Sequence, residues 1–205
     1  MNRTVLFRIG LLGVILFIIS STIGGLYIEN YNPLSQFISE TYAIDTQYGK
    51  YLRFLGYIPS GLLLTVFAFT SIKLFPKSRL IKIGFMGIGL FYGIATIIVG
   101  FFPCDKGCNK EFLDPTLSQL IHNLTGFLTY VFVPISIFLI AIGLRQVKST
   151  SSLVTIGMGC GTISLLFSFI LFSAPTSSLA GLYQRIVELA FITWIVACAY
   201  YIKKA

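Results

Sequence analysis

The sequence predicts an all-α membrane protein, a bundle of six transmembrane helices, and three observations support this fold class. Of the 205 residues, 56% are hydrophobic and only 11% are charged, whereas about 25% of the residues in a soluble domain are charged. The uncharged stretches are long enough to cross a hydrocarbon layer, which takes about 20 helical residues. The lysines and arginines stand in short groups between these stretches, as they do in the loops of membrane proteins.

Charged or turn-forming residues bound each expected span. The stretch before Glu29 is about twenty uncharged residues long, which favours a retained helix over a cleaved secretory signal. The segment Pro175-Thr176-Ser177-Ser178 divides the long apolar stretch after residue 149 into two helices. Residues 1–205 are interpreted as one polytopic membrane domain, with spans expected near 6–28, 52–73, 82–103, 116–144, 150–173 and 182–202.

The distribution of bases predicts the orientation. With six spans, successive connections alternate sides, and one side carries five bases and all seven acids. The other side carries no acid and ten bases, which are Arg3, Arg8, Lys73, Lys77, Arg79, Lys82, Arg145, Lys148, Lys203 and Lys204. Because cytoplasmic loops are enriched in lysine and arginine, both termini are expected in the cytoplasm and the chain in the cell membrane. The net charge of +8 therefore does not indicate nucleic acid, whose binders gather their bases on one face.

Two of the four cysteines fall in the second outer loop. An oxidising exterior favours a disulfide between Cys104 and Cys108. Free thiols are one alternative, and a metal site that adds Asp105 and His122 to the two thiols is another. The site expected from the sequence contains no metal and no cofactor.

The first outer loop has the marks of a short helix. Asn32 is a suitable cap, and Pro33 suits the first helical position. Ser35 and Ser39 would fall one turn apart, beside an apolar face. The segment is expected to be an interfacial helix that either lies flat on the membrane surface or enters the mouth of the bundle.

Polar residues mark the outer ends of the fourth and sixth spans. Asp114 is the expected cap of the fourth span, and the polar stripe containing Gln119 and His122 should face inward, since it would be costly against lipid. His122 is the only histidine and is either a hydrogen-bonded structural residue or a functional one. In the sixth span, Arg185 either pairs with Glu188 or binds a lipid phosphate or carboxylate.

These groups come from different helices at similar depth, so one outward-opening pocket is expected to gather them: Ser39, Glu40, Asp105, His122, Gln184, Arg185 and Glu188. The first functional hypothesis is the binding or passage of a small polar or lipidic ligand, with membrane lipids as partners. Its expected binding residues are Ser35, Glu40, Gln119, Gln184, Arg185 and Glu188. The alternative is an intramembrane lipid hydrolase, in which Asp105 orients His122 and His122 activates Ser39 or a water molecule.

The order of these motifs is similar to that of a known family. Pro33-Leu34-Ser35-Gln36-Phe37-Ile38-Ser39-Glu40 follows the first span, Phe102-Pro103-Cys104-Asp105 follows the third, and Gly181-Leu182-Tyr183-Gln184-Arg185 opens the sixth. Together with His122, they resemble the bacterial and archaeal membrane family known as domain of unknown function 998. The resemblance implies the six-helix fold and supplies no reaction. A histidine is common in that family where Asn32 stands here, so a two-histidine site is not implied.

Overall fold

A computed structural model describes residues 2–145 and 150–204 and confirms the six-helix fold. Over this part of the chain, no strand is present and six helices are long and apolar enough to cross a membrane. Four spans are each a single α-helix: α1 (Arg3–Leu26), α6 (Leu117–Leu144), α7 (Ser151–Ser173) and α8 (Ala180–Lys204). The second span consists of α2 (Gly49–Leu52), η2 (Arg53–Tyr57) and α3 (Ile58–Ser71), and the third of α4 (Arg79–Ile88), η3 (Gly89–Ile94) and α5 (Ala95–Phe101).

The observed helix ends differ from the expected ones by at most three residues. Three spans begin earlier than the uncharged stretches do, at Arg3, Gly49 and Arg79. A long basic side chain lies along the helix and keeps its charged end in water, so a helix continues through such residues into the headgroup layer. The first charged residue therefore indicates the edge of the hydrocarbon layer, and the helix itself extends a few residues beyond it.

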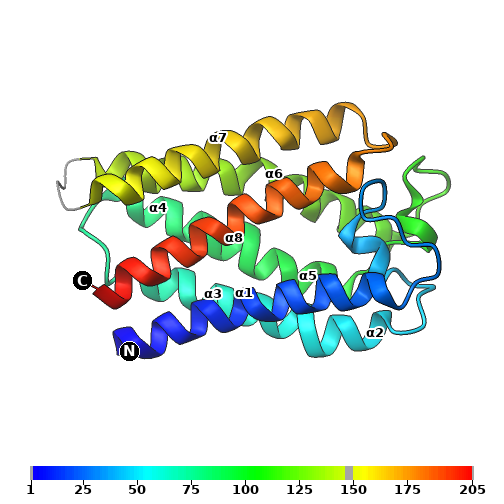
Figure 1. Ribbon diagram of the computed structural model, residues 1–205, viewed down its shortest axis with the longest axis horizontal. Helices are drawn as coiled ribbons and strands as arrows, with labels where there is room; N and C mark the ends of the chain where they lie inside the picture. Colours follow the sequence, from blue (N-terminus) through cyan, green and yellow to red (C-terminus); the bar gives the residue numbers. More distant parts are fainter. Residues whose placement is uncertain (1, 146–149, 205) are drawn as a thin grey trace.

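The six spans form a closed ring in chain order. Each span packs against the next, and α8 returns to pack against α1. Figure 1 shows both termini at one end of the elongated bundle and the longer loops at the opposite end, which we call the loop end. Termini on one side are required by an even number of spans. Their cytoplasmic location stays a prediction, and Lys148, one of the bases behind it, lies outside the described residues.

Glycines let neighbouring spans approach closely. A Cβ added to Gly61 would lie 2.7 Å from the carbonyl oxygen of Gly93, so the second and third spans meet backbone to backbone. A Cβ on Gly157 would lie 2.8 Å from the Trp194 ring, at the contact between α7 and α8. Such contacts are the usual way in which membrane helices associate.

Two spans contain a π-helical segment, η2 in the second and η3 in the third. A π-helical turn inserts residues into an α-helix and rotates the side chains that follow it, and such turns are frequent at functional sites. Tyr57 lies at the end of η2 and Tyr92 lies within η3. Both tyrosines are almost fully buried.

The first loop differs in detail from the expected helix. Asn32 accepts a hydrogen bond from the Leu34 backbone as a cap would, but only a turn follows it, and a 3-10 helix, η1 (Ile38–Tyr42), forms later. The backbone of Phe37 is extended, and the Glu40 carboxylate accepts a hydrogen bond from the Phe37 backbone N–H at 2.7 Å. All five residues of η1 are buried, so the segment enters the mouth of the bundle and does not lie flat on the membrane.

Candidate functional site

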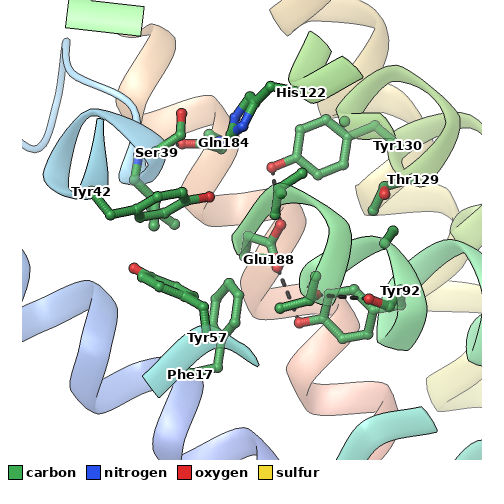
Figure 2. A pocket seen from close by; sticks show the side chains of 15 residues that line it. Phe17, Ser39, Tyr42, Tyr57, Tyr92, His122, Thr129, Tyr130, Gln184 and Glu188 are labelled. Atoms are coloured by element: carbon green, nitrogen blue, oxygen red, sulfur yellow. Dashed lines mark hydrogen bonds between the residues drawn. The ribbon is translucent and has the colours of Figure 1, made fainter. Parts of the chain in front are cut away.

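A polar cavity lies inside the loop end of the bundle, directly beneath η1 (Figure 2). Its volume is about 90 Å³, which leaves room for several water molecules or a small polar group, since one water needs only about 10–15 Å³. Five spans and η1 supply its walls, which are formed by Phe17, Ile38, Ser39, Tyr42, Tyr57, Tyr92, Ala95, Thr96, Val99, His122, Gly126, Thr129, Tyr130, Gln184 and Glu188.

Glu188 of α8 is the acidic group of the cavity, and it is only 7% exposed. The Tyr130 hydroxyl donates to one carboxylate oxygen at 2.9 Å, and the Tyr92 hydroxyl donates to the other at 3.1 Å. Figure 2 shows the carboxylate between these two rings. In the described part of the chain, the only ion pair joins Lys110 and Glu40, so Glu188 has no basic partner.

A series of aromatic rings extends from Tyr92, beside Glu188, along the cavity wall. The Tyr42 and Tyr57 ring centroids are 4.4 Å apart, Phe17 lies 5.5 Å from Tyr57, and Tyr92 lies 6.2 Å from Phe17. Burial, together with the nearby Glu188 charge, raises the pKa of the Tyr42 hydroxyl, which therefore remains a protonated donor. The Tyr57 hydroxyl is buried and has no hydrogen-bond partner among the described residues.

His122 and Ser39 form the part of the wall nearest the loops. The imidazole Nδ1 lies 2.9 Å from the Phe102 carbonyl oxygen, which can only accept, so Nδ1 carries the proton and Nε2 is left as an acceptor. The Ser39 hydroxyl lies 3.2 Å from the Cys108 sulfur. Each side chain therefore already has a partner on the second outer loop.

The two loop cysteines form a disulfide, Cys104–Cys108. Possible ligand atoms of Cys104, Cys108 and His122 all lie within 4.8 Å of one another, so three of the four residues of the metal alternative are close together, and Asp105 is not in this group. Cysteine binds metals as a thiolate, and these two sulfurs are bonded to each other. The disulfide form therefore does not offer that ligand set.

Asp105 lies outside the cavity wall and does not contact His122. Its carboxylate accepts hydrogen bonds from the Thr116 hydroxyl at 2.6 Å and from the Thr116 backbone N–H at 3.0 Å. The Thr116 hydroxyl bond is the main reason that the pKa of Asp105 is lowered. Thr116 is the N-cap of α6, two residues after the expected cap, Asp114. The structure thus brings Ser39 and His122 together in one wall but places the third member of the hydrolase hypothesis elsewhere.

Arg185 holds the first loop in place. One of its terminal nitrogens donates to the carbonyl oxygens of Pro33 at 2.7 Å and of Gln36 at 2.9 Å, and the other donates to the Tyr31 hydroxyl at 2.5 Å. At Gly181, one turn earlier, an added Cβ would collide with the same loop backbone. Arg185 therefore binds the first loop and does not form an ion pair with Glu188 in the described part of the chain.

Three other expected binding residues, Ser35, Glu40 and Gln119, also hold the loops. Lys110 forms the ion pair with Glu40 at 2.7 Å and donates to the Ser35 carbonyl oxygen at 3.0 Å. Gln119 accepts from the Asp105 backbone N–H at 2.6 Å. The expected site residues thus divide into two groups: the cavity wall contains Ser39, His122, Gln184 and Glu188, whereas the loop contacts involve Ser35, Glu40, Asp105, Gln119 and Arg185.

Sequence reasoning missed the aromatic residues of the cavity. Tyr92 stands in the middle of an apolar span, away from the membrane interfaces where tyrosine is commonly enriched, whereas Tyr57 lies only four residues after Arg53, near the outer end of its span. The mid-span position is a signal that could have identified Tyr92, whereas the position of Tyr57 is an ordinary one for a tyrosine at the interface.

A second hollow, the "side opening", adjoins the cavity between α6, the end of α7 and the start of α8. Its volume is about 290 Å³. Phe127 and Phe172 lie in its wall and are 50% and 40% exposed on the outside of the bundle. A Cβ added to Gly126 would meet no atom within 4 Å. The side opening and the cavity share five wall residues, which are Ser39, His122, Gly126, Tyr130 and Gln184.

Neither a curated protein nor a solved structure matches the chain. A family model matches residues 11–201, and its description is that of a protein of unknown function, DUF998. The matched segment contains every residue of the cavity wall, together with both loops that cover the cavity. The chain therefore belongs to the DUF998 family.

Proposed function

We propose that this protein binds an amphipathic small molecule of the cell membrane, with its polar group in the cavity and its apolar part in the side opening. The observation that carries the proposal is the adjacency of the two hollows. The cavity wall contains the Glu188 carboxylate, several hydroxyls and an imidazole among apolar groups. The side opening contains no acid and adds the exposed phenylalanines, and the two hollows share five wall residues. A ligand with one polar and one apolar end matches this division.

The loops favour entry from the bilayer over entry from water. The segment Ile38–Tyr42 is buried across the mouth of the cavity, and the Gln184 side chain accepts from the Ile38 backbone N–H at 2.6 Å. The second loop supports the first, since the Ile44 backbone N–H donates to the Cys104 carbonyl oxygen at 3.0 Å. The side opening, in contrast, reaches the outer surface beside exposed phenylalanines, where a membrane helix faces lipid.

The π-helical segments support a binding role for the cavity. A π-helical turn weakens the regular hydrogen bonding of a helix, and it is retained mostly where it positions a functional side chain. Here the two spans that contain such turns each place one tyrosine, Tyr57 or Tyr92, in the cavity wall.

Binding is favoured over hydrolysis by the contacts of the three residues that the hydrolase hypothesis requires. A general base needs a group that orients it and a nucleophile within hydrogen-bond reach. Asp105 is bonded to Thr116, and the Ser39 hydroxyl lies against the Cys108 sulfur. His122 is oriented by the Phe102 carbonyl oxygen, a partner that suits a structural or ligand-binding imidazole equally well.

Gly126→Leu tests the proposal, because it places a side chain in open space where the two hollows meet. The binding of lysophosphatidylcholine and lysophosphatidylglycerol with the same acyl chain would be measured by native mass spectrometry of the purified protein in a maltoside detergent. Wild type should bind at least one of the two, and Gly126→Leu should weaken that binding by about tenfold, or about 1.4 kcal/mol.

Gly159→Leu is the matched control. A Cβ on Gly159 of α7 would also meet no atom within 4 Å, but Gly159 lines neither hollow. Equal losses in both variants would show that binding occurs on the general lipid-facing surface. That result, or no binding of either lipid by wild type, would overturn the proposal.

A further inference from the structure

We propose that the polar group bound in the cavity is a cation, namely a small primary or methylated ammonium group held by the Glu188 carboxylate and the surrounding aromatic rings. This inference rests on the proposed function and names its ligand class. The juxtaposition of an unpaired acid with a row of aromatic rings is the observation that leads to it.

The cavity wall contains one acidic side chain and no lysine or arginine. The titratable groups of the wall are one histidine, four tyrosines and Glu188, so no lysine or arginine faces the carboxylate. Two nearby bases have other partners: Lys110 pairs with Glu40, and Arg185 of α8 donates to loop carbonyl oxygens and to Tyr31. Arg53 lies near Tyr42 but is not part of the wall.

A buried acid without a base is a costly arrangement, because removing the carboxylate from water is only partly offset by hydrogen bonds. The two tyrosine hydroxyls satisfy one lone pair on each oxygen of Glu188 and leave the others available. A cationic ligand would supply the missing charge, and a primary ammonium group would also supply the missing donors. An anionic ligand would meet a like charge.

The aromatic rings of the wall can also bind a cation. Phe17, Tyr42, Tyr57 and Tyr92 form a continuous series of ring contacts along one wall, with centroids 4.4–6.2 Å apart. The face of an aromatic ring is electron-rich and attracts cations, and rings arranged around an ammonium group are a recurring means of binding it. These rings share the cavity with Glu188, so the carboxylate and the ring faces would act on the same group.

An organic cation suits this wall better than a bare metal ion. Hard metal ions take six or more oxygen ligands, and the phenylalanine and tyrosine ring faces offer none. The Tyr57 hydroxyl, a buried donor without a hydrogen-bond partner among the described residues, can bond to an oxygen of the same ligand. The ligand that fits is therefore an amphiphile whose polar end combines an ammonium group with an oxygen-bearing group.

The same two lysolipids test this inference, because they differ in the presence of an ammonium group. Wild type should bind lysophosphatidylcholine about tenfold more tightly than lysophosphatidylglycerol. Glu188→Gln keeps the shape of the side chain and removes its charge, so the ratio should fall to about one. Glu111→Gln, which neutralises an exposed acid of the second loop, should leave the ratio unchanged.

A second pair of variants keeps the test decisive if Glu188→Gln does not fold. Tyr57→Phe retains the ring face and should keep the preference for lysophosphatidylcholine, whereas Tyr57→Leu removes the face and should lower it severalfold. If wild type binds both lipids equally, or prefers lysophosphatidylglycerol, the cation inference is overturned while the proposed function stands. If neither lipid binds, both are overturned.

Discussion

Three tyrosine-to-phenylalanine substitutions measure how the Glu188 carboxylate is stabilised. Tyr92→Phe and Tyr130→Phe each delete one hydroxyl that donates to Glu188, at 3.1 and 2.9 Å, and keep the ring. A hydrogen bond to a charged group contributes about 1.5–3 kcal/mol, and its loss leaves a buried acceptor without a donor. We therefore expect each substitution to lower the free energy of unfolding by about 2 kcal/mol.

Tyr57→Phe is the matched control within the same cavity. It deletes a hydroxyl that is also buried but has no hydrogen-bond partner among the residues that the structure describes, and burying an unpaired hydroxyl costs about 1–3 kcal/mol. Its removal should leave the free energy of unfolding unchanged or raise it by about 1 kcal/mol. The sign of the effect thus depends on the partner of the hydroxyl, because the chemical change is the same in all three variants.

Unfolding by sodium dodecyl sulfate in mixed micelles, followed by circular dichroism, gives the required comparison. The expected order of stability is Tyr57→Phe equal to or above wild type, and Tyr92→Phe and Tyr130→Phe clearly below it. Equal destabilisation by all three variants would refute this reasoning, since it would mean that the contacts of Glu188 contribute nothing specific. The same conclusion would follow if all three were neutral.

Three further predictions concern the loops and the orientation. Arg185→Lys cannot reproduce the planar fork that reaches two carbonyl oxygens and the Tyr31 hydroxyl, so limited proteolysis should cut the loop 27–48 several times faster than in wild type. Asp105 has a lowered pKa because of Thr116, so its stabilising effect is present above its unfolded pKa and is lost as the pH falls through the folded value; the stability of Asp105→Asn should depend less on pH than that of wild type between about pH 5 and pH 3. A cysteine introduced at the exposed Glu29 should react with an impermeant maleimide in intact cells, and labelling only after permeabilisation would contradict the predicted orientation.

The fold could be predicted because hydrocarbon leaves few alternatives. A backbone without water must satisfy its own hydrogen bonds, so an apolar stretch of about twenty residues becomes a helix whatever its exact sequence. Pro175 and its neighbours were enough to separate α7 from α8. Helix ends are harder to predict, since bases such as Arg79 lie inside the helix that they were expected to precede.

The candidate site could be predicted only in part, because the same side chains serve loops and cavities. Arg185 and Glu188 are one helical turn apart, yet one donates to loop carbonyl oxygens and the other faces the cavity. Loops lack regular backbone pairing, so their carbonyl and N–H groups need side-chain partners that the sequence does not identify. Some polar residues at the loop end therefore hold the loops and others line the cavity. Only the path of the backbone determines which residue does which.

The aromatic residues of the cavity wall could not be predicted from the sequence for a different reason. Tyr57 and Tyr92 reach the cavity through π-helical segments, which change the angle between successive side chains, so α-helical spacing does not place them on one face. Glu188, by contrast, lies on a regular helix. Placing an acid inside a membrane span costs free energy, so such an acid is a functional candidate on that ground alone. The cost of burying the acid identifies the position of the site, whereas the two π-helical turns add Tyr57 and Tyr92 to the wall of the cavity around it.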